Sequence, residues 1–180
     1  GLIVSGLVAS ASLNSQAGQK EPFEIDRFIS PDTCAECHSE IFEQWENSMH
    51  NLSHKDPIYF RLARYLRQGL TDKGEIEEAE SCVKCHTPVG FVSGFPTQLS
   101  DDLSKTPAIA TRGIQCDYCH SAHSVEKMYN NGLVLTPGHG EDDPGIKYGP
   151  FDDSEPDFHE AKYSVLHTES KICGTCHNVK

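Results

Sequence analysis

Cys34-Ala-Glu-Cys37-His38 is the first of four copies of one five-residue pattern, Cys-x-x-Cys-His, in this chain of 180 residues. The other copies are Cys82-Val-Lys-Cys85-His86, Cys116-Asp-Tyr-Cys119-His120 and Cys173-Gly-Thr-Cys176-His177. Together these four pentads contain all eight cysteines. Two thiols at this spacing can form thioethers with the vinyl groups of a haem, and the adjacent histidine can bind the iron from one face. The pattern therefore predicts four covalently bound haem c groups.

Structural zinc sites and disulfides are the other common uses of paired cysteines. Eight cysteines could form two Cys₄ zinc centres. Histidine makes up 10 of the 180 residues. A histidine directly after all four pairs would therefore arise by chance with odds on the order of one in 10⁵. Neither zinc nor disulfides explain that repeated histidine, so the pattern favours haem.

Length and composition indicate what kind of fold holds these groups. With four haems in 180 residues, each haem has 45 residues to itself. The hydrophobic fraction is 37%, below the usual 45–50% of globular domains. We therefore expect a mostly loop fold with some α-helix and almost no β-structure, a multihaem cytochrome c wrapped around a stacked haem chain. The net charge of −12 excludes a nucleic-acid partner, which requires a basic patch.

The first part of the chain differs from the rest. Residues 1–12 are apolar or small and resemble the apolar region of a secretory signal followed by a small-residue cleavage site. The stretch is too short to span a bilayer, and no other segment is long and apolar enough to do so. We expect residues 1–29 to form an apolar arm that packs on its own body or on a neighbouring subunit. Residues 30–180 would form one tetrahaem domain.

Helix-start signals precede the first haem pentad and recur after it. Ser30-Pro31 predicts a helix that opens at the first pentad and continues to His50 and His54, which lie four residues apart and hence on one face. Asp56-Pro57 predicts a second helix that stops at Gly69. The acidic residues 71–81 favour a further helix leading into the second pentad.

Glycine and proline dominate two later segments. They predict mostly loop for residues 87–113 and irregular structure for residues 121–157. A last helical segment is expected from about Asp157, carrying His159 and His167 towards the fourth pentad.

Six histidines lie outside the pentads and could bind an iron from its second face. His50, His54, His159 and His167 are the preferred second ligands. His123 follows its own pentad too closely to avoid steric competition, and His139 lies between two glycines in a flexible turn. Met49 and Met128 are weaker candidates. With six spare histidines for four positions, we expect four six-coordinate, bis-histidine irons of low reduction potential.

Longer motifs around the pentads carry a family resemblance over about residues 30–180. They include Trp45-Glu-Asn-Ser48-Met-His50, Gly113-Ile-Gln-Cys116 and Lys147-Tyr-Gly-Pro150. The chain resembles the tetrahaem cytochromes c related to the nitrification electron carriers, and most of all the OmcE-type extracellular cytochrome filaments. The resemblance implies bis-histidine haems in alternating parallel and T-shaped pairs, and an axial histidine donated by the adjacent subunit. It matches His50, His54, His159 and His167 to the family's second ligands.

These features together predict electron transfer rather than catalysis. The expected form is the repeating subunit of an extracellular filament, a head-to-tail homopolymer that exchanges electrons with redox partner proteins or an extracellular acceptor. One alternative is a soluble periplasmic tetrahaem carrier. The other is a multihaem reductase of small nitrogen compounds with one open iron. Covalent haem attachment takes place outside the cytoplasm, so the protein is expected to be secreted and extracellular or on the cell surface, with the periplasm as the alternative.

Overall fold

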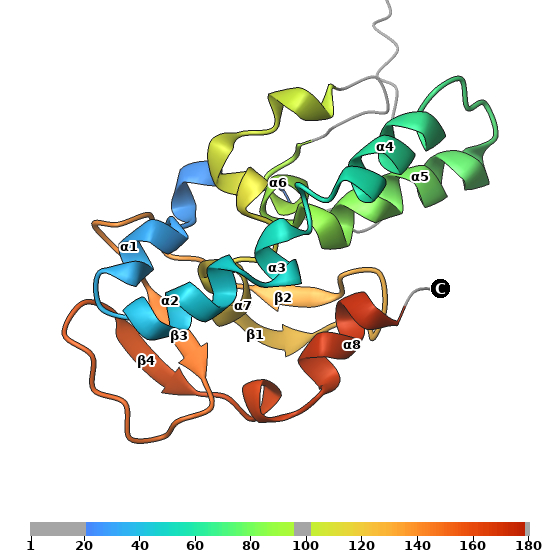
Figure 1. The fold of residues 1–180 in the computed structure, drawn as a ribbon. Helices are drawn as coiled ribbons and strands as arrows, with labels where there is room; N and C mark the ends of the chain where they lie inside the picture. The colour runs from blue at the N-terminus through green and yellow to red at the C-terminus, as the bar shows by residue number, and fades with distance from the viewer. Residues whose placement is uncertain (1–20, 96–101, 179–180) are drawn as a thin grey trace, which may run out of the picture.

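The computed structural model describes residues 21–95 and 102–178. About half of these residues are helical, and the others form turns, loops and four short strands (Figure 1). The α-helices are α1 (Pro31–Ala35), α2 (Ser39–Glu46), α3 (Met49–Leu52), α4 (Pro57–Leu66), α5 (Lys73–His86), α6 (Pro88–Val92), α7 (Cys116–His120) and α8 (Lys171–His177). The 3-10 helices are η1 (Ile25–Arg27), η2 (Leu103–Lys105), η3 (Ala108–Arg112) and η4 (Val165–Thr168). The strands are β1 (Ala122–Val125), β2 (Leu133–Leu135), β3 (Ile146–Gly149) and β4 (Glu160–Tyr163).

The expected fold class is confirmed, and the packed side-chain interior of the described residues is small. One cluster centres on Phe28, Val89 and Tyr118, and a second on Tyr59 and Val83. Many large apolar side chains remain exposed around them: Ile41, Met49, Leu52, Ile58, Leu62, Tyr65, Phe151, Phe158, Tyr163 and Val165. The polypeptide alone therefore buries little of its apolar surface.

The predicted helix starts are confirmed. Ser30 caps α1, its hydroxyl accepting from the Asp32 backbone N–H, and Pro31 occupies the first turn. Asp56 caps α4 by accepting from the Tyr59 backbone N–H at 2.7 Å. The predicted acidic helix is α5, which runs directly into the second pentad.

The single helix predicted from the first pentad to His54 is wrong, because the chain breaks between α2 and α3. The Ser48 hydroxyl donates to the Trp45 carbonyl at 2.7 Å, and the Asn47 amide donates to the Glu43 carbonyl at 3.0 Å. Side chains that take up helix carbonyls in this way compete with the backbone and end the helix. His50 therefore lies in α3, whereas His54 lies beyond its end.

The loop predicted for residues 87–113 is also partly wrong. Pro88 begins α6, and Pro107 directly precedes η3. A proline in the first turn loses no helical hydrogen bond, so these two prolines start helices instead of breaking them.

The two later segments contain strands that the sequence did not indicate. β1 and β2 pair antiparallel within the segment predicted to be irregular. β4 replaces the beginning of the predicted C-terminal helix and pairs parallel with β3, with Ile146 opposite Glu160. Paired residues of β3 and β4 are 14 positions apart in the sequence. A search for local helical periodicity therefore cannot reveal this pairing.

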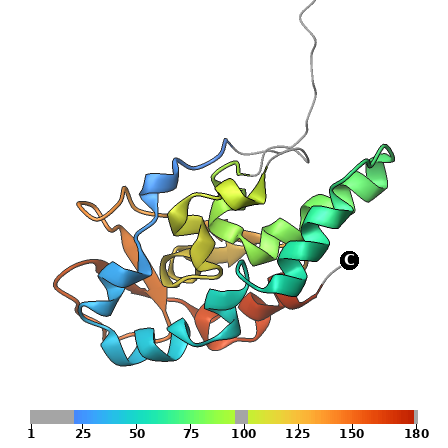
Figure 2. The ribbon, with the colours of Figure 1, turned by 45° about the horizontal axis from the view of Figure 1, so that its top comes forward.

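Helices α4 and α5 pack side by side and project from the rest of the molecule as a hairpin (Figures 1 and 2). In the described part of the chain, no helix combines the length and apolar character needed to cross a bilayer. Most of the arm proposed for residues 1–29 lies outside the described residues, which begin at residue 21.

Candidate haem-binding sites

Each pentad lies on or next to a short helical turn. The second pentad ends α5, the third forms α7, and the fourth ends α8. In the first pentad, the His38 backbone N–H donates to the Cys34 carbonyl at 2.9 Å, which closes a turn between α1 and α2. Residues three apart lie on the same side of a helical turn, so both thiols of each pentad can face one ligand.

Three pentad histidines face a second histidine from a distant part of the chain. The ring centroids of His38 and His159 are 6.5 Å apart, those of His50 and His177 are 6.4 Å apart, and those of His120 and His167 are 5.7 Å apart. Metal–imidazole bonds of about 2 Å, with about 1.1 Å from ring nitrogen to ring centre, place two trans imidazoles roughly 6.3 Å apart. The three pairs therefore have the separation expected of two imidazoles on opposite faces of one iron.

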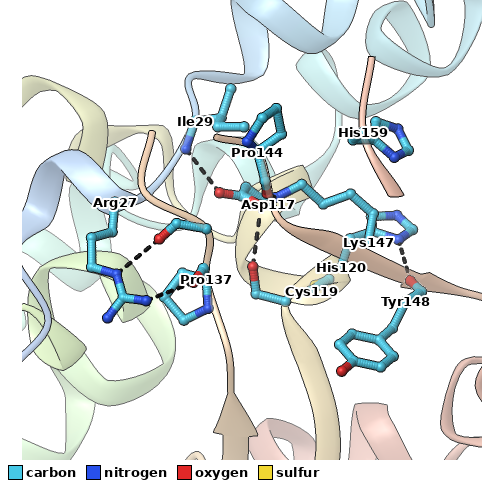
Figure 3. Close-up of polar contacts among 12 residues, drawn as sticks. Arg27, Ile29, Asp117, Cys119, His120, Pro137, Pro144, Lys147, Tyr148 and His159 are labelled. Carbon is cyan, nitrogen blue, oxygen red and sulfur yellow. Dashed lines mark hydrogen bonds and ion pairs between the residues drawn. The ribbon is translucent and has the colours of Figure 1, made fainter. Parts of the chain in front are cut away.

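Backbone carbonyls orient several of these rings. Nδ1 of His86 donates to the Ser53 carbonyl at 3.0 Å, Nδ1 of His120 to the Tyr148 carbonyl at 2.7 Å (Figure 3), and Nδ1 of His159 to the Glu160 carbonyl at 3.0 Å. A carbonyl can only accept, so Nδ1 carries the proton and Nε2 keeps its lone pair. This is the usual arrangement behind a metal-binding imidazole.

His167 is oriented the other way round. Its Nε2 lies 3.0 Å from the Cys119 carbonyl, and its Nδ1 is buried without a hydrogen-bond partner among the described residues. A buried ring nitrogen without a partner is costly in an ordinary protein interior. An iron between His120 and His167 would satisfy it, so this pair fits the implied haem.

Among the described residues, His86 is the pentad histidine whose ring stacks on a tyrosine, Tyr59, at 4.1 Å between centroids, instead of pairing with an imidazole. His54, one of the predicted second ligands, is buried, and its Nδ1 lies 2.8 Å from the Thr87 hydroxyl. Burial lowers the pKa of His54, and the charges of Lys55 and His86 lower it further, so His54 lies near this pentad histidine. Its role as an iron ligand stays a prediction.

His123 and His139 are both exposed. The ring of His123 lies beside Tyr148, at 5.8 Å between centroids. The His139 backbone N–H donates to the Asp143 carbonyl at 2.7 Å. Neither imidazole faces a pentad histidine of its own chain.

The surroundings of His50 and His120 favour the neutral imidazole. Burial lowers the pKa of His50, with the neighbouring His177 adding to the effect, and burial likewise lowers the pKa of His120, beside His167. Burial also lowers the pKa of His54. Neutral imidazole is the form that binds a metal.

The four pentads lie next to one another. The thiol of Cys34 lies beside that of Cys116, which raises the pKa of Cys34, and the thiol of Cys85 lies beside that of Cys176, which raises the pKa of Cys85. Burial, together with the nearby Cys176 and Cys173, raises the pKa of the Cys119 thiol to about 12. The first pentad is therefore a neighbour of the third, and the fourth is a neighbour of both the third and the second. Across residues 21–95 and 102–178, no three cysteine, histidine or acidic side chains converge as they would on a zinc ion.

A buried polar group that the sequence analysis missed supports the third pentad. The Asp117 side chain is fully buried, pairs with the Lys147 ammonium, and accepts from the Ile29 backbone N–H at 2.8 Å (Figure 3). Lys147 also donates to the Pro144 carbonyl. The sequence did contain a signal for this group. Asp117 is a charged residue inside a pentad, at a position that takes no part in haem attachment, and a charge that becomes buried needs a partner.

Arg27 connects the N-terminal segment to the same region. Its guanidinium donates to the Gly138 and Pro137 carbonyls, both at 2.8 Å (Figure 3). Together with Asp117, Arg27 holds the segment before α1 against the third pentad.

Comparisons with known proteins agree with this geometry. Residues 33–121, which include the first three pentads, match the family model described as cytochrome c554 and c-prime. The fold is similar to the crystal structure of a penta-heme cytochrome c552 from Thermochromatium tepidum, with a TM-score of 0.59 and 21% sequence identity. No curated protein matches the sequence significantly. The two matches support a multihaem c-type cytochrome.

The structural match covers 87% of this chain and 47% of the penta-heme cytochrome. At 21% identity it shows a shared multihaem cytochrome fold. The fourth pentad lies outside the family match, and helix α8 and the pairing of His177 with His50 support it.

Proposed function

We propose that the chain transfers electrons through four covalently attached haem c groups, one on each pentad. A bound haem supplies an iron that accepts and releases one electron. The eight cysteines would attach the porphyrins, and His38, His86, His120 and His177 would each bind one iron. His159, His167 and His50 would bind three of these irons from the other face. The observation that carries this proposal is the set of three imidazole pairs at 5.7–6.5 Å.

The contacts between thiols support one continuous path. Adjacent thiols link the first pentad to the third and the second to the fourth, while Cys119 lies near the fourth. Electrons would therefore pass in the order first, third, fourth and second pentad. The first and second pentads are the two ends, where electrons would enter and leave.

We further propose that the chain is the repeating subunit of a secreted, extracellular or cell-surface filament. The second pentad lies at one end of the path, and the His86 ring there stacks on Tyr59 instead of pairing with an imidazole. His123 and His139 are exposed and unused. One of them, from an adjacent subunit, would complete the His86 iron. A head-to-tail contact whose rotation does not close produces a filament, and its register would be fixed by this bond.

The same observation favours one alternative. If neither His54 nor a neighbouring subunit supplies a ligand, the His86 iron has an open face, as a reductase of small nitrogen compounds requires. Tyr59 and His54, which both contact the Thr87 hydroxyl, are the groups near this pentad that could move a proton. A periplasmic tetrahaem carrier is the remaining possibility when all four irons are six-coordinate in a monomer.

One set of measurements separates these functions. The intact mass should equal that of the polypeptide plus four haems. Electron microscopy of the purified protein should show filaments, and electron paramagnetic resonance of the same sample, once oxidised, should show only low-spin iron. In the double variant His123→Ala/His139→Ala, filaments should be lost and one high-spin centre should appear.

The matched control is His159→Ala, which should open the site of His38 but leave filaments intact. Monodisperse wild-type protein with one high-spin, carbon-monoxide-binding iron would instead establish the reductase arrangement. Fewer than four haems by mass would refute the proposed function itself.

A further inference from the structure

Three of the four pentads contact one residue, Asn131, which lies in the loop between β1 and β2. Its backbone N–H donates to the Thr175 carbonyl at 2.7 Å. Its side-chain amide donates through Nδ2 to the Lys84 carbonyl and accepts through Oδ1 from the Tyr118 hydroxyl. Asn131 is buried, with 9% of its surface exposed.

The three partners occupy the same position in three different pentads. Lys84, Tyr118 and Thr175 each stand directly before the second cysteine of their Cys-x-x-Cys pair. Every contact of Asn131 is therefore one residue from a predicted haem attachment. Tyr118 and Thr175 are themselves almost fully buried, with 1% and 0% exposed.

Local backbone geometry explains why an asparagine occupies this position. Asn131 has φ +60°, in the left-handed region that asparagine tolerates better than other side chains. Its amide also combines two donor hydrogens with an acceptor oxygen. Aspartate would lack the donor for Lys84, and glycine would keep the backbone shape while losing both side-chain bonds.

The rest of the loop is held against the fourth pentad. The Asn178 amide donates to the Met128 carbonyl at 2.9 Å, and the Met128 side chain reaches Gly174. At Gly132, an added Cβ would lie 2.0 Å from the Lys127 carbonyl oxygen, so the turn is tight. The loop that carries Asn131 is consequently held in place against the fourth pentad.

We propose that Asn131 is a positioning residue that sets the spacing and orientation of the second, third and fourth haems relative to one another. This inference rests on the proposed function, because it concerns electron passage between those haems. Asn131 touches none of the predicted iron ligands. Its removal should therefore change coupling between haems while leaving each iron's own ligation unchanged.

The test compares variants that remove one or both side-chain links. Asn131→Gly removes both, Asn131→Asp removes the donor to Lys84, and Tyr118→Phe removes the hydroxyl that bonds Oδ1. The control is Asn47→Gly, since the Asn47 amide donates to the Glu43 carbonyl at the C-terminal end of α2. Circular dichroism in the Soret band reports exciton coupling between neighbouring haems, and flash photoreduction reports electron transfer between them.

In the holoprotein, the variant Asn131→Gly should lose the Soret couplet and transfer electrons between haems more slowly. Its intact mass should still show four haems, and its electron paramagnetic resonance spectrum should show unchanged low-spin signals. Each single-link variant should lose part of the couplet, and Asn47→Gly none. An unchanged couplet and rate in Asn131→Gly would overturn the inference and leave the proposed function standing. If Asn131→Gly does not fold, Tyr118→Phe decides by the same two readouts. Wild-type protein without haem would refute the proposed function instead.

Discussion

Replacing Lys147 by methionine should destabilise the protein far more than the same change on the surface. Lys147 is 13% exposed and neutralises Asp117, whose side chain is 0% exposed. The variant leaves that carboxylate buried with two donors, the Ile29 N–H at 2.8 Å and the Ser121 hydroxyl at 3.1 Å, but without its cation. Breaking a buried ion pair by removing one partner costs about 3–5 kcal/mol.

Guanidinium denaturation of the holoprotein measures this loss. Trp45 is the single tryptophan, and its indole donates to the Ile114 carbonyl at 2.7 Å, so its fluorescence reports unfolding. The control is Lys73→Met, because Lys73 pairs with Glu77 at 3.8 Å with 91% and 68% of the side chains exposed. A surface pair of this kind contributes about 0–1 kcal/mol. Equal losses in the two variants would refute the reasoning.

Three further predictions follow from the described contacts. Acid–acetone extraction should leave all haem on the denatured protein, because the pentads attach it covalently; release of haem into the acetone would contradict this. His159→Ala should convert one low-spin iron to high spin, the one bound to His38, and a loss of two low-spin signals would mean that the pairing is misassigned. Gly113→Ala should cost at least about 2 kcal/mol, since Gly113 has φ +63° and an added Cβ would lie 2.2 Å from the His50 carbonyl oxygen. Its denaturation midpoint should fall, and an unchanged midpoint would contradict the clash.

Local signals in the sequence predicted much of this structure. The pentads, the caps at Ser30 and Asp56, and the helix before the second pentad depend on residues a few positions apart. Counting histidines also selected His50, His159 and His167, which the structure places opposite pentad histidines.

Features that depend on distant partners were not predictable in this way. The parallel pairing of β3 with β4 sets the position of His159, and its residues carry no local strand pattern. The contact between His54 and the Thr87 hydroxyl, 33 residues away, was likewise not predictable from the sequence, and the role of His54 as an iron ligand stays a prediction. The helix breaks at Ser48 because its side chain competes with the backbone for a helix carbonyl. A pattern of hydrophobic residues does not reveal such competition.

The pairing of histidines also bears on how the protein matures. Each of the three imidazole pairs contains one residue from the stretch 159–177, whether the other member is His38, His50 or His120. A chain that emerges from its N-terminus holds three of its four pentads before any pair can close. Haem would be attached to the first and third pentads while the second faces of their irons are still open, and residues 159–177 would then close the sites of the first, third and fourth pentads.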